Sequence, residues 1–220
     1  MGKLLLLVSF AQILAGQVRL PGPGGESAAS SSMSATFVTG NSVAGCNGGS
    51  PACSLSLTGV PVGARTIVFT SSGATSVTGT LGETYTLVQI LTAGANEKGW
   101  VSTATTQSGT DTVSQSGGYN TMEAAAYSSV TGYDSGATNG TATGNTGPIT
   151  LSIPGTAGDL TVAWVSGPLT SPVSTACGSM TLRLNDGNIL FDVAMASTIY
   201  SLSCAIGYSS TWGVIGVSLK

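Results

Sequence analysis

From about Ala35 onward, short runs rich in Val, Thr, Ile, Leu and Tyr alternate with clusters of Gly, Asn, Ser and Pro. This texture is typical of β-strands separated by turns. It predicts the following strands: Ser54–Thr58, Arg65–Thr70, Thr84–Leu91, Trp100–Thr105, Thr121–Tyr127, Ile149–Ile153, Leu160–Val165, Met180–Leu184, Ile189–Ala194, Ile199–Ala205 and Trp212–Leu219. Eleven strands at this spacing favour an all-β fold, an antiparallel β-sandwich.

Two segments give sharper local predictions. The pair Asp186-Gly187 lies between two apolar runs, and it supplies the positive φ angles that a tight hairpin turn needs. Residues Thr121–Tyr127 include good helix formers, which leaves a helix open there. Because Gly118 and Gly132 leave little room for a helix, a strand is favoured.

The N-terminal segment has the pattern of an export signal. Lys3 precedes the apolar run Leu4–Ala15, and Ala15-Gly16 offers small residues for cleavage. The run is shorter than the roughly 20 apolar residues of a transmembrane helix. We expect residues 1–16 to be a signal peptide or, if retained, an arm that packs on a neighbouring subunit. Residues 17–34 are rich in Pro, Gly and Ser and predict a flexible linker, which leaves 35–220 as a single β-sandwich domain.

The four cysteines fit an exported protein. An even number behind an export signal predicts disulfides, and proximity along the chain favours Cys46–Cys53 and Cys177–Cys204 among the three possible pairings. A zinc site of four thiolates is disfavoured, because no pair has the close spacing typical of such sites.

The composition limits the kinds of catalytic and binding site that the chain can form. The chain has no histidine and 7% charged residues, which excludes Ser-His-Asp and Cys-His catalytic sites. Its net charge is −3 and its six Lys and Arg residues are scattered, so nucleic-acid binding is disfavoured. We expect no metal and no cofactor, and an Asp-Ser-Gly triplet at Asp134 predicts a turn, since an aspartic protease needs two such triplets.

Carboxylates offer the one route to an enzyme. A glycoside-active pair could come from Glu83, Glu97, Glu123, Asp134 and Asp159, with Tyr85, Trp100, Tyr127 or Trp164 stacking on a sugar. The nine acidic residues include several expected in turns, so we expect the protein not to be an enzyme.

Ligand binding needs fewer specialised side chains than catalysis does. The weak candidates for a carbohydrate surface are Tyr85, Trp100, Trp164 and Trp212, although tryptophans more often fill the core. Oxygen ligands for calcium are present in expected loops, at Asp111, Asp134, Asn139, Asn145, Asp186 and Asn188, but without the spacing of a calcium loop. Asn139 also begins a glycosylation sequon, Asn139-Gly140-Thr141.

Several short motifs occur together in order over Thr75–Lys220. Thr80–Thr86 resembles the D-x-x-G-N-x-Y-T hairpin of a large class of secreted bacterial and phage-associated β-sandwich modules. Further matches are Gly109–Val113, Glu123–Val130, Gly158–Leu160 and Trp212–Lys220. Glu83 replaces the usual asparagine, and the cysteine pairs are not part of the pattern. The resemblance implies a jelly-roll-like sandwich on exported or surface-exposed proteins, with no established catalytic role and no functional residues to transfer.

These observations lead to one functional expectation and one alternative. We expect a non-enzymatic extracellular structural or interaction subunit, such as part of a surface layer, appendage, adhesin or virus particle. Its partners would be copies of itself or other surface proteins. The alternative is a carbohydrate-binding module, which needs exposed aromatic side chains.

Overall fold

Every strand pairing in the described part of the chain is antiparallel, and the strands form four sheets. In this computed structural model the described residues are 35–46, 53–71, 73–91, 97–117, 120–145, 147–167, 169, 176–207 and 210–220. All belong to one unit, Ser32–Lys220. The predicted signal peptide and linker, 1–34, lie outside the described residues.

Two five-stranded sheets are called the inner sheets. The first has the order β1-β8-β3-β6-β5, with β1 Thr36–Cys46, β8 Asn120–Ser128, β3 Arg65–Thr70, β6 Glu97–Ser102 and β5 Tyr85–Leu91. The second has the order β12-β13-β11-β15-β9, with β12 Thr181–Asn185, β13 Asn188–Ala194, β11 Leu160–Ser166, β15 Ser210–Leu219 and β9 Tyr133–Asn145.

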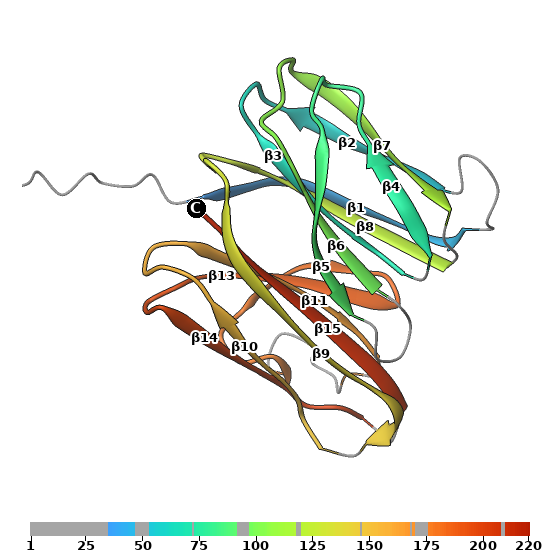
Figure 1. Cartoon of the computed structure of the whole chain (residues 1–220), viewed down its shortest axis with the longest axis vertical. Helices are drawn as coiled ribbons and strands as arrows, with labels where there is room; N and C mark the ends of the chain where they lie inside the picture. The colour runs from blue at the N-terminus through green and yellow to red at the C-terminus, as the bar shows by residue number, and fades with distance from the viewer. Residues whose placement is uncertain are drawn as a thin grey trace, which may run out of the picture. The chain divides into compact units, whose positions relative to one another are not determined.

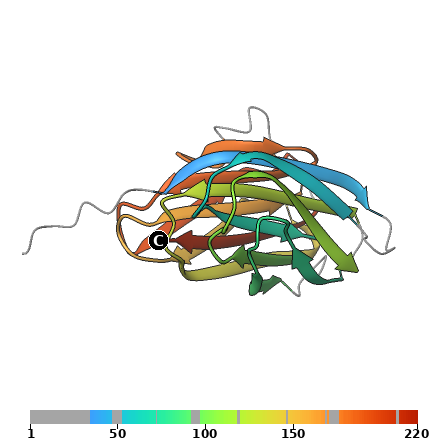
Figure 2. The same ribbon diagram turned by 90° about the horizontal axis from the view of Figure 1, so that it is seen from above.

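Two smaller sheets are called the outer sheets. The three-stranded one has the order β2-β7-β4, with β2 Cys53–Val60, β7 Gly109–Gly117 and β4 Ala74–Thr78. The two-stranded one pairs β10, Ile149–Pro154, with β14, Ile199–Cys204. Figure 1 shows the sheets as successive layers, and Figure 2 shows their strands running in broadly similar directions.

Three hydrophobic clusters separate the four layers. One lies between the three-stranded outer sheet and the first inner sheet. The second lies between the two inner sheets and is called the central boundary. The third lies between the second inner sheet and β10–β14. The protein is therefore an all-β antiparallel sandwich, as predicted, in which the inner sheets are covered on both faces.

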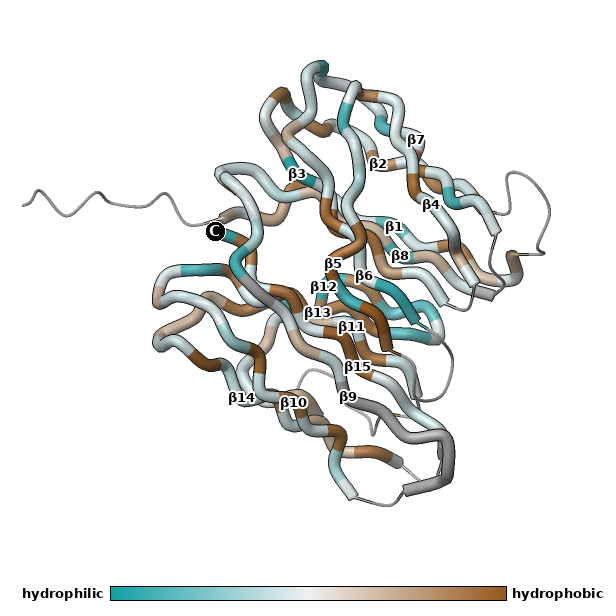
Figure 3. Tube along the Cα trace, in the orientation of Figure 1, coloured by the Kyte–Doolittle hydropathy of each residue, from teal (hydrophilic) through white to brown (hydrophobic). Residues whose placement is uncertain are grey.

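Burial on both faces explains the sequence of the inner strands. Along β8, Met122 and Ala124 face the first cluster, whereas Ala125 and Tyr127 face the central boundary. β11 is apolar and buried almost throughout because neither of its faces meets water. In the outer strand β2, by contrast, every second side chain near the start is exposed. Figure 3 shows the difference as brown along β11 and β15 and paler colours over much of the outer strands.

The two halves of the chain repeat one strand connectivity. In β1–β8 the pairs β1·β8, β2·β7 and β3·β6 are nested, and β3 also pairs with β8, which is a jelly-roll arrangement. In β9–β15 the pairs β9·β15, β10·β14, β11·β13 and β11·β15 correspond to these one by one. The sandwich is thus built from two halves that share this connectivity, except that β4 of the first half has no counterpart in the second. The halves meet through their larger sheets at the central boundary.

Each predicted strand overlaps an observed one, and Thr121–Tyr127 is confirmed as a strand within β8. Four strands, β1, β4, β7 and β9, were not predicted, because Gly, Ser and Thr dominate them and no apolar run marks them. The prediction of a turn at Asp134 is wrong, since the Asp-Ser-Gly triplet lies inside β9. The Asp-Gly hairpin joins β12 to β13, where Gly187 has a φ of 80°.

Two disulfides brace the chain. Cys46–Cys53 joins the end of β1 to the start of β2. Cys177–Cys204 joins the connection before β12 to the end of β14, and both of its residues are fully buried in the third cluster. These bonds are compatible with an oxidising compartment.

Removing the longer disulfide should destabilise the fold more than removing the shorter one. In the chain-entropy model, the 27-residue separation of Cys177 and Cys204 corresponds to about 3–4 kcal/mol. The 7-residue separation of Cys46 and Cys53 corresponds to about 2–3 kcal/mol. Urea unfolding of the double variants Cys177→Ala/Cys204→Ala and Cys46→Ala/Cys53→Ala measures both losses. A smaller loss for the longer loop would contradict this assignment.

Candidate functional site

The central boundary contains two buried glutamates. Glu97 begins β6 and is 2% exposed, and Glu123 lies in β8 and is 0% exposed. Burial raises the pKa of Glu97 to about 7, and a hydrogen bond from Ser166 lowers it in part. Burial likewise raises the pKa of Glu123 to about 8, with Trp164 opposing the shift and Asp186 adding to it. At pH 7 Glu123 is therefore mostly protonated, and Glu97 is about half protonated.

A pocket of about 220 Å³ opens beside Glu97. It is lined by Ser71, Glu97, Thr121, Trp164, Ser166, Gly167, Asn188, Thr211 and Trp212, and is called the Glu97 pocket. Glu97 is the one charged residue in this lining. Pockets favour junctions between structural units, and this one lies where the two halves meet.

Equivalent strand ends from the two halves build the pocket. Ser71 follows β3 and lies next to Glu97 by the β3·β6 register. At the corresponding place in the second half, Ser166 pairs with Asn188. Glu97 and Asn188 are therefore topologically equivalent, so the acid is present in one half and the amide in the other. Deeper in the boundary the equivalent residues Phe69 and Trp164 stack with ring centroids 5.8 Å apart.

Serine and glycine hold the Glu97 side chain in place. The Ser166 hydroxyl donates a hydrogen bond to Glu97 Oε1. A Cβ at position 213 would collide with Glu97 Oε2, so Gly213 makes the space that the carboxyl occupies. Glu97 Oε2 has no hydrogen-bond partner within the described residues. Glu97 was among the candidate acids predicted from the sequence. The roles of Ser166 and Gly213 were not predicted, because they depend on strands that are far apart in the chain.

A second pair of acids lies in the first half. Glu83, just before β5, faces Asp111 of β7, and burial followed by the nearby Asp111 charge raises the pKa of Glu83. Asp111 is fully buried, and its Oδ1 accepts a hydrogen bond of 2.8 Å from the backbone N–H of Thr80. The Tyr85 hydroxyl lies 3.5 Å from Glu83 Oε1. The Thr80–Thr86 motif therefore forms a closed polar cluster with Asp111, not an open site.

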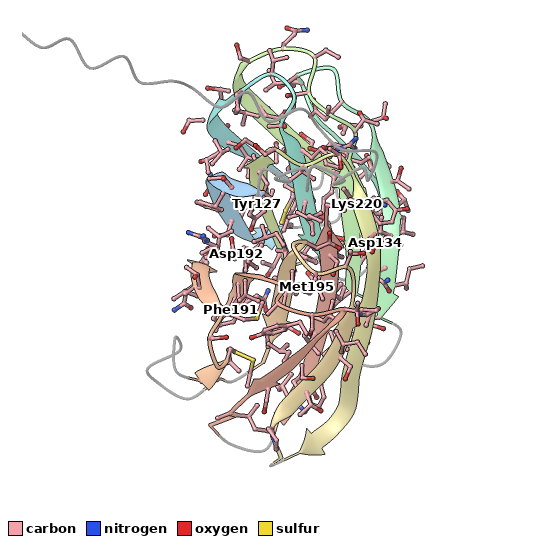
Figure 4. All side chains as sticks on the ribbon, turned by 90° about the vertical axis from the view of Figure 1, so that its left-hand side faces the viewer. Tyr127, Asp134, Phe191, Asp192, Met195 and Lys220 are labelled. Carbon is pink, nitrogen blue, oxygen red and sulfur yellow. A yellow bond between two sulfur atoms is a disulfide. The ribbon has the colours of Figure 1, made fainter. Side chains whose placement is uncertain are left out.

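The remaining paired acids have structural partners. The Tyr127 hydroxyl donates a hydrogen bond of 3.1 Å to Asp192, which also forms an ion pair of 2.7 Å with Arg183. Asp134 forms an exposed ion pair of 3.5 Å with Lys220. Figure 4 labels Tyr127 and Asp192, and also Asp134 and Lys220. None of these contacts lies in the Glu97 pocket.

The aromatic candidates for sugar stacking are not presented at the surface. Trp100, Trp164 and Trp212 are 6%, 0% and 5% exposed, and Tyr85 is half-buried. Trp100 donates its indole hydrogen bond to Thr70 Oγ1 at 3.2 Å. The packing of the inner sheets takes up these rings, so the carbohydrate alternative loses the side chains on which it depended.

The candidate calcium ligands lie on several different elements of the fold. Asp111 lies in β7, and Asp134, Asn139 and Asn145 lie in β9, which corrects their expected place in loops. Asp186 precedes the hairpin glycine, and Asn188 begins β13, which also corrects its expected place in a loop. No group of three or more Cys, Asp or Glu side chains suited to a metal ion occurs in the described ranges. Asn139 pairs with Val214 through its backbone, and its glycosylation stays a prediction.

The exposed faces of both outer sheets carry hydroxyl side chains in register. On the three-stranded sheet, Ser54, Ser114 and Thr78 form one cross-strand row. On the two-stranded sheet, Thr150 pairs with Ser203 and Ser152 with Ser201, at the edge of a hollow of about 510 Å³. The five outer strands contain one charged residue, Asp111, and it faces inward. Both faces are therefore polar but uncharged.

Comparisons with known proteins return no relative. No protein-family model matches the chain, and neither a curated protein nor a solved structure matches it. In the part of the chain that the structure describes, no helix has the length and apolar character to cross a membrane.

The buried glutamates predict that the protein is most stable in mild acid. The folded state raises the pKa of Glu97 and Glu123 from 4.5 to about 7 and about 8, so it binds their protons more tightly than the unfolded chain does. The free energy of unfolding therefore falls, by several kcal/mol in total, as pH rises through that window. Urea unfolding from mildly acidic to mildly alkaline pH measures the fall.

Amide variants provide the control for this pH dependence. Glu97→Gln and Glu123→Gln should each reduce the fall, because an amide does not ionise. Asp134→Asn should leave it unchanged, because the exposed Asp134 has a pKa lowered from 3.8, outside the window. A free energy of unfolding that is level or rises across the window would show that both glutamates are ionised in the folded protein.

Proposed function

We propose that this protein is a non-enzymatic extracellular structural or interaction subunit that associates with copies of itself or with other surface proteins. The observation that carries the proposal is the pair of uncharged hydroxyl faces on the outer sheets. Export and an oxidising compartment are supported by the N-terminal pattern and the two disulfides.

Uncharged hydroxyl faces suit close contact between proteins. Burying a hydroxyl costs far less than burying a charge, and a hydroxyl can both donate and accept a hydrogen bond. Few like charges oppose the approach of a second copy, since charged residues make up 7% of the chain. Because the two outer faces differ, contact of one with the other would be heterologous and could extend into a filament.

Two long, nearly uncharged edge strands support the same proposal. Edge strands of soluble proteins usually carry charges or prolines that block pairing with another chain. β1, an edge of the first inner sheet, has eleven residues and neither feature. β9, an edge of the second inner sheet, has thirteen residues, and Asp134 is its one charged residue. Long neutral edges of this kind can add a strand from a partner.

A glycoside-active enzyme is less well supported. Such enzymes canonically use two carboxyl groups on either side of the scissile bond. The Glu97 pocket contains one, and Glu123 is not among its lining residues. Glu83 and Asp111 are enclosed in their own cluster.

Adding a positive charge to either hydroxyl face should weaken association. We expect the exported protein to form oligomers or filaments whose size rises with concentration in sedimentation velocity and electron microscopy. Ser114→Lys and Ser152→Lys each place a charge within one face and should weaken association at least tenfold. Gln107→Lys adds the same charge in the exposed loop before β7 and should not.

Two results would contradict the proposal. One is a wild-type protein that stays monomeric at every concentration and binds no other surface protein. The other is association that survives both serine substitutions unchanged while circular dichroism shows all variants folded.

A further inference from the structure

The Glu97 carboxyl has the features expected of a group that binds a ligand. Glu97 Oε2 lacks a hydrogen-bond partner among the described residues, although the side chain is 2% exposed and lines the pocket. Leaving such a group without a hydrogen bond is unfavourable, because burial removes the water that would otherwise pair with it. Ser166 and Gly213 nevertheless hold the carboxyl in this position.

The cations of the described chain are engaged elsewhere. Arg65 donates to the backbone carbonyls of Ser102, Val130 and Thr131. Lys98 points from β6 to the carbonyl of Ala74, Arg183 pairs with Asp192, and Lys220 pairs with Asp134. A carboxylate at Glu97 would therefore need a counter-ion from a ligand.

The lining favours an organic cation. Two indoles, of Trp164 and Trp212, and the hydroxyls of Thr121 and Ser166 surround the acid. Indole rings attract ammonium groups, and an ammonium has three N–H donors for carboxylate and hydroxyl oxygens. A calcium ion takes 6–8 oxygen ligands and commonly several carboxylates, whereas this lining has one. A volume of 220 Å³ equals that of about seven waters, which suits a small organic molecule.

We propose that the Glu97 pocket binds a small organic cation that carries an ammonium group, with Glu97 as its counter-ion. This site is separate from the outer hydroxyl faces and does not depend on the proposed function. Binding would draw the proton from Glu97, whose pKa of about 7 reflects burial. Glu123 is the other titratable group near Trp164, and Asp186 acts on Glu123.

Indole NMR signals provide a direct test. n-Butylammonium chloride is titrated into the ¹⁵N-labelled full chain at pH 8.5, and 1-butanol, its neutral counterpart, is titrated in parallel. We expect a saturable shift of the Trp164 and Trp212 indole N–H signals with the cation and none with the alcohol. Calcium chloride tests the metal alternative and should not reproduce the shift.

Variants then locate the site. Glu97→Gln should lose at least tenfold in affinity, and Glu83→Gln, another buried glutamate outside the pocket, should keep wild-type affinity. Ser166→Ala should weaken binding less than Glu97→Gln does, because Ser166 positions the carboxyl. The unmodified chain gives the same information through pH, since affinity should be about tenfold lower at pH 6 for a pKa of about 7.

Three outcomes would overturn the proposal. An equal response to 1-butanol would show apolar binding, and an equal response to calcium would show an inorganic cation site. Unchanged affinity in Glu97→Gln would show that Glu97 is not the counter-ion.

Discussion

The contact between the two inner sheets is the one on which the rest of the structure depends. Phe69 and Trp164, from equivalent strands of the two halves, stack at this boundary. Burying each inner sheet on both faces leaves its strands apolar throughout, and such strands need a cover on either side. The outer sheets supply the second cover. Each half has its own small outer sheet, whereas the faces of the inner sheets at the central boundary cover one another.

This arrangement explains where the few charged groups lie. Glu97 and Glu123 are buried at the boundary, and in the described part of the chain neither forms an ion pair, so burial raises the pKa of both carboxyls. Outside, hydroxyls replace charge on both outer faces. The lack of histidine and the scarcity of charge thus have two consequences: the surface is suited to neutral contacts, and one isolated acid lines a pocket between the halves.

Sequence predicts the strands that contain apolar runs, such as Leu160–Val165, and it predicts the all-β class. It misses β9, because a strand of Gly, Thr and Asn is recognisable only through its pairing with β15. The layering could not be predicted either, since two-faced burial depends on contacts between strands distant in the chain. Glu97 was one of five candidate acids, and its selection comes from Ser166, Gly213 and the pocket.

Because the two halves bury their large sheets against each other, we expect them to fold as one unit. Native-state hydrogen exchange followed by NMR tests it directly, because amides of β3 and β11 report on the two halves separately. The slowest amides of both strands should open with the same free energy and the same denaturant dependence. Two distinct opening free energies, with one half exchanging while the other stays protected, would contradict it.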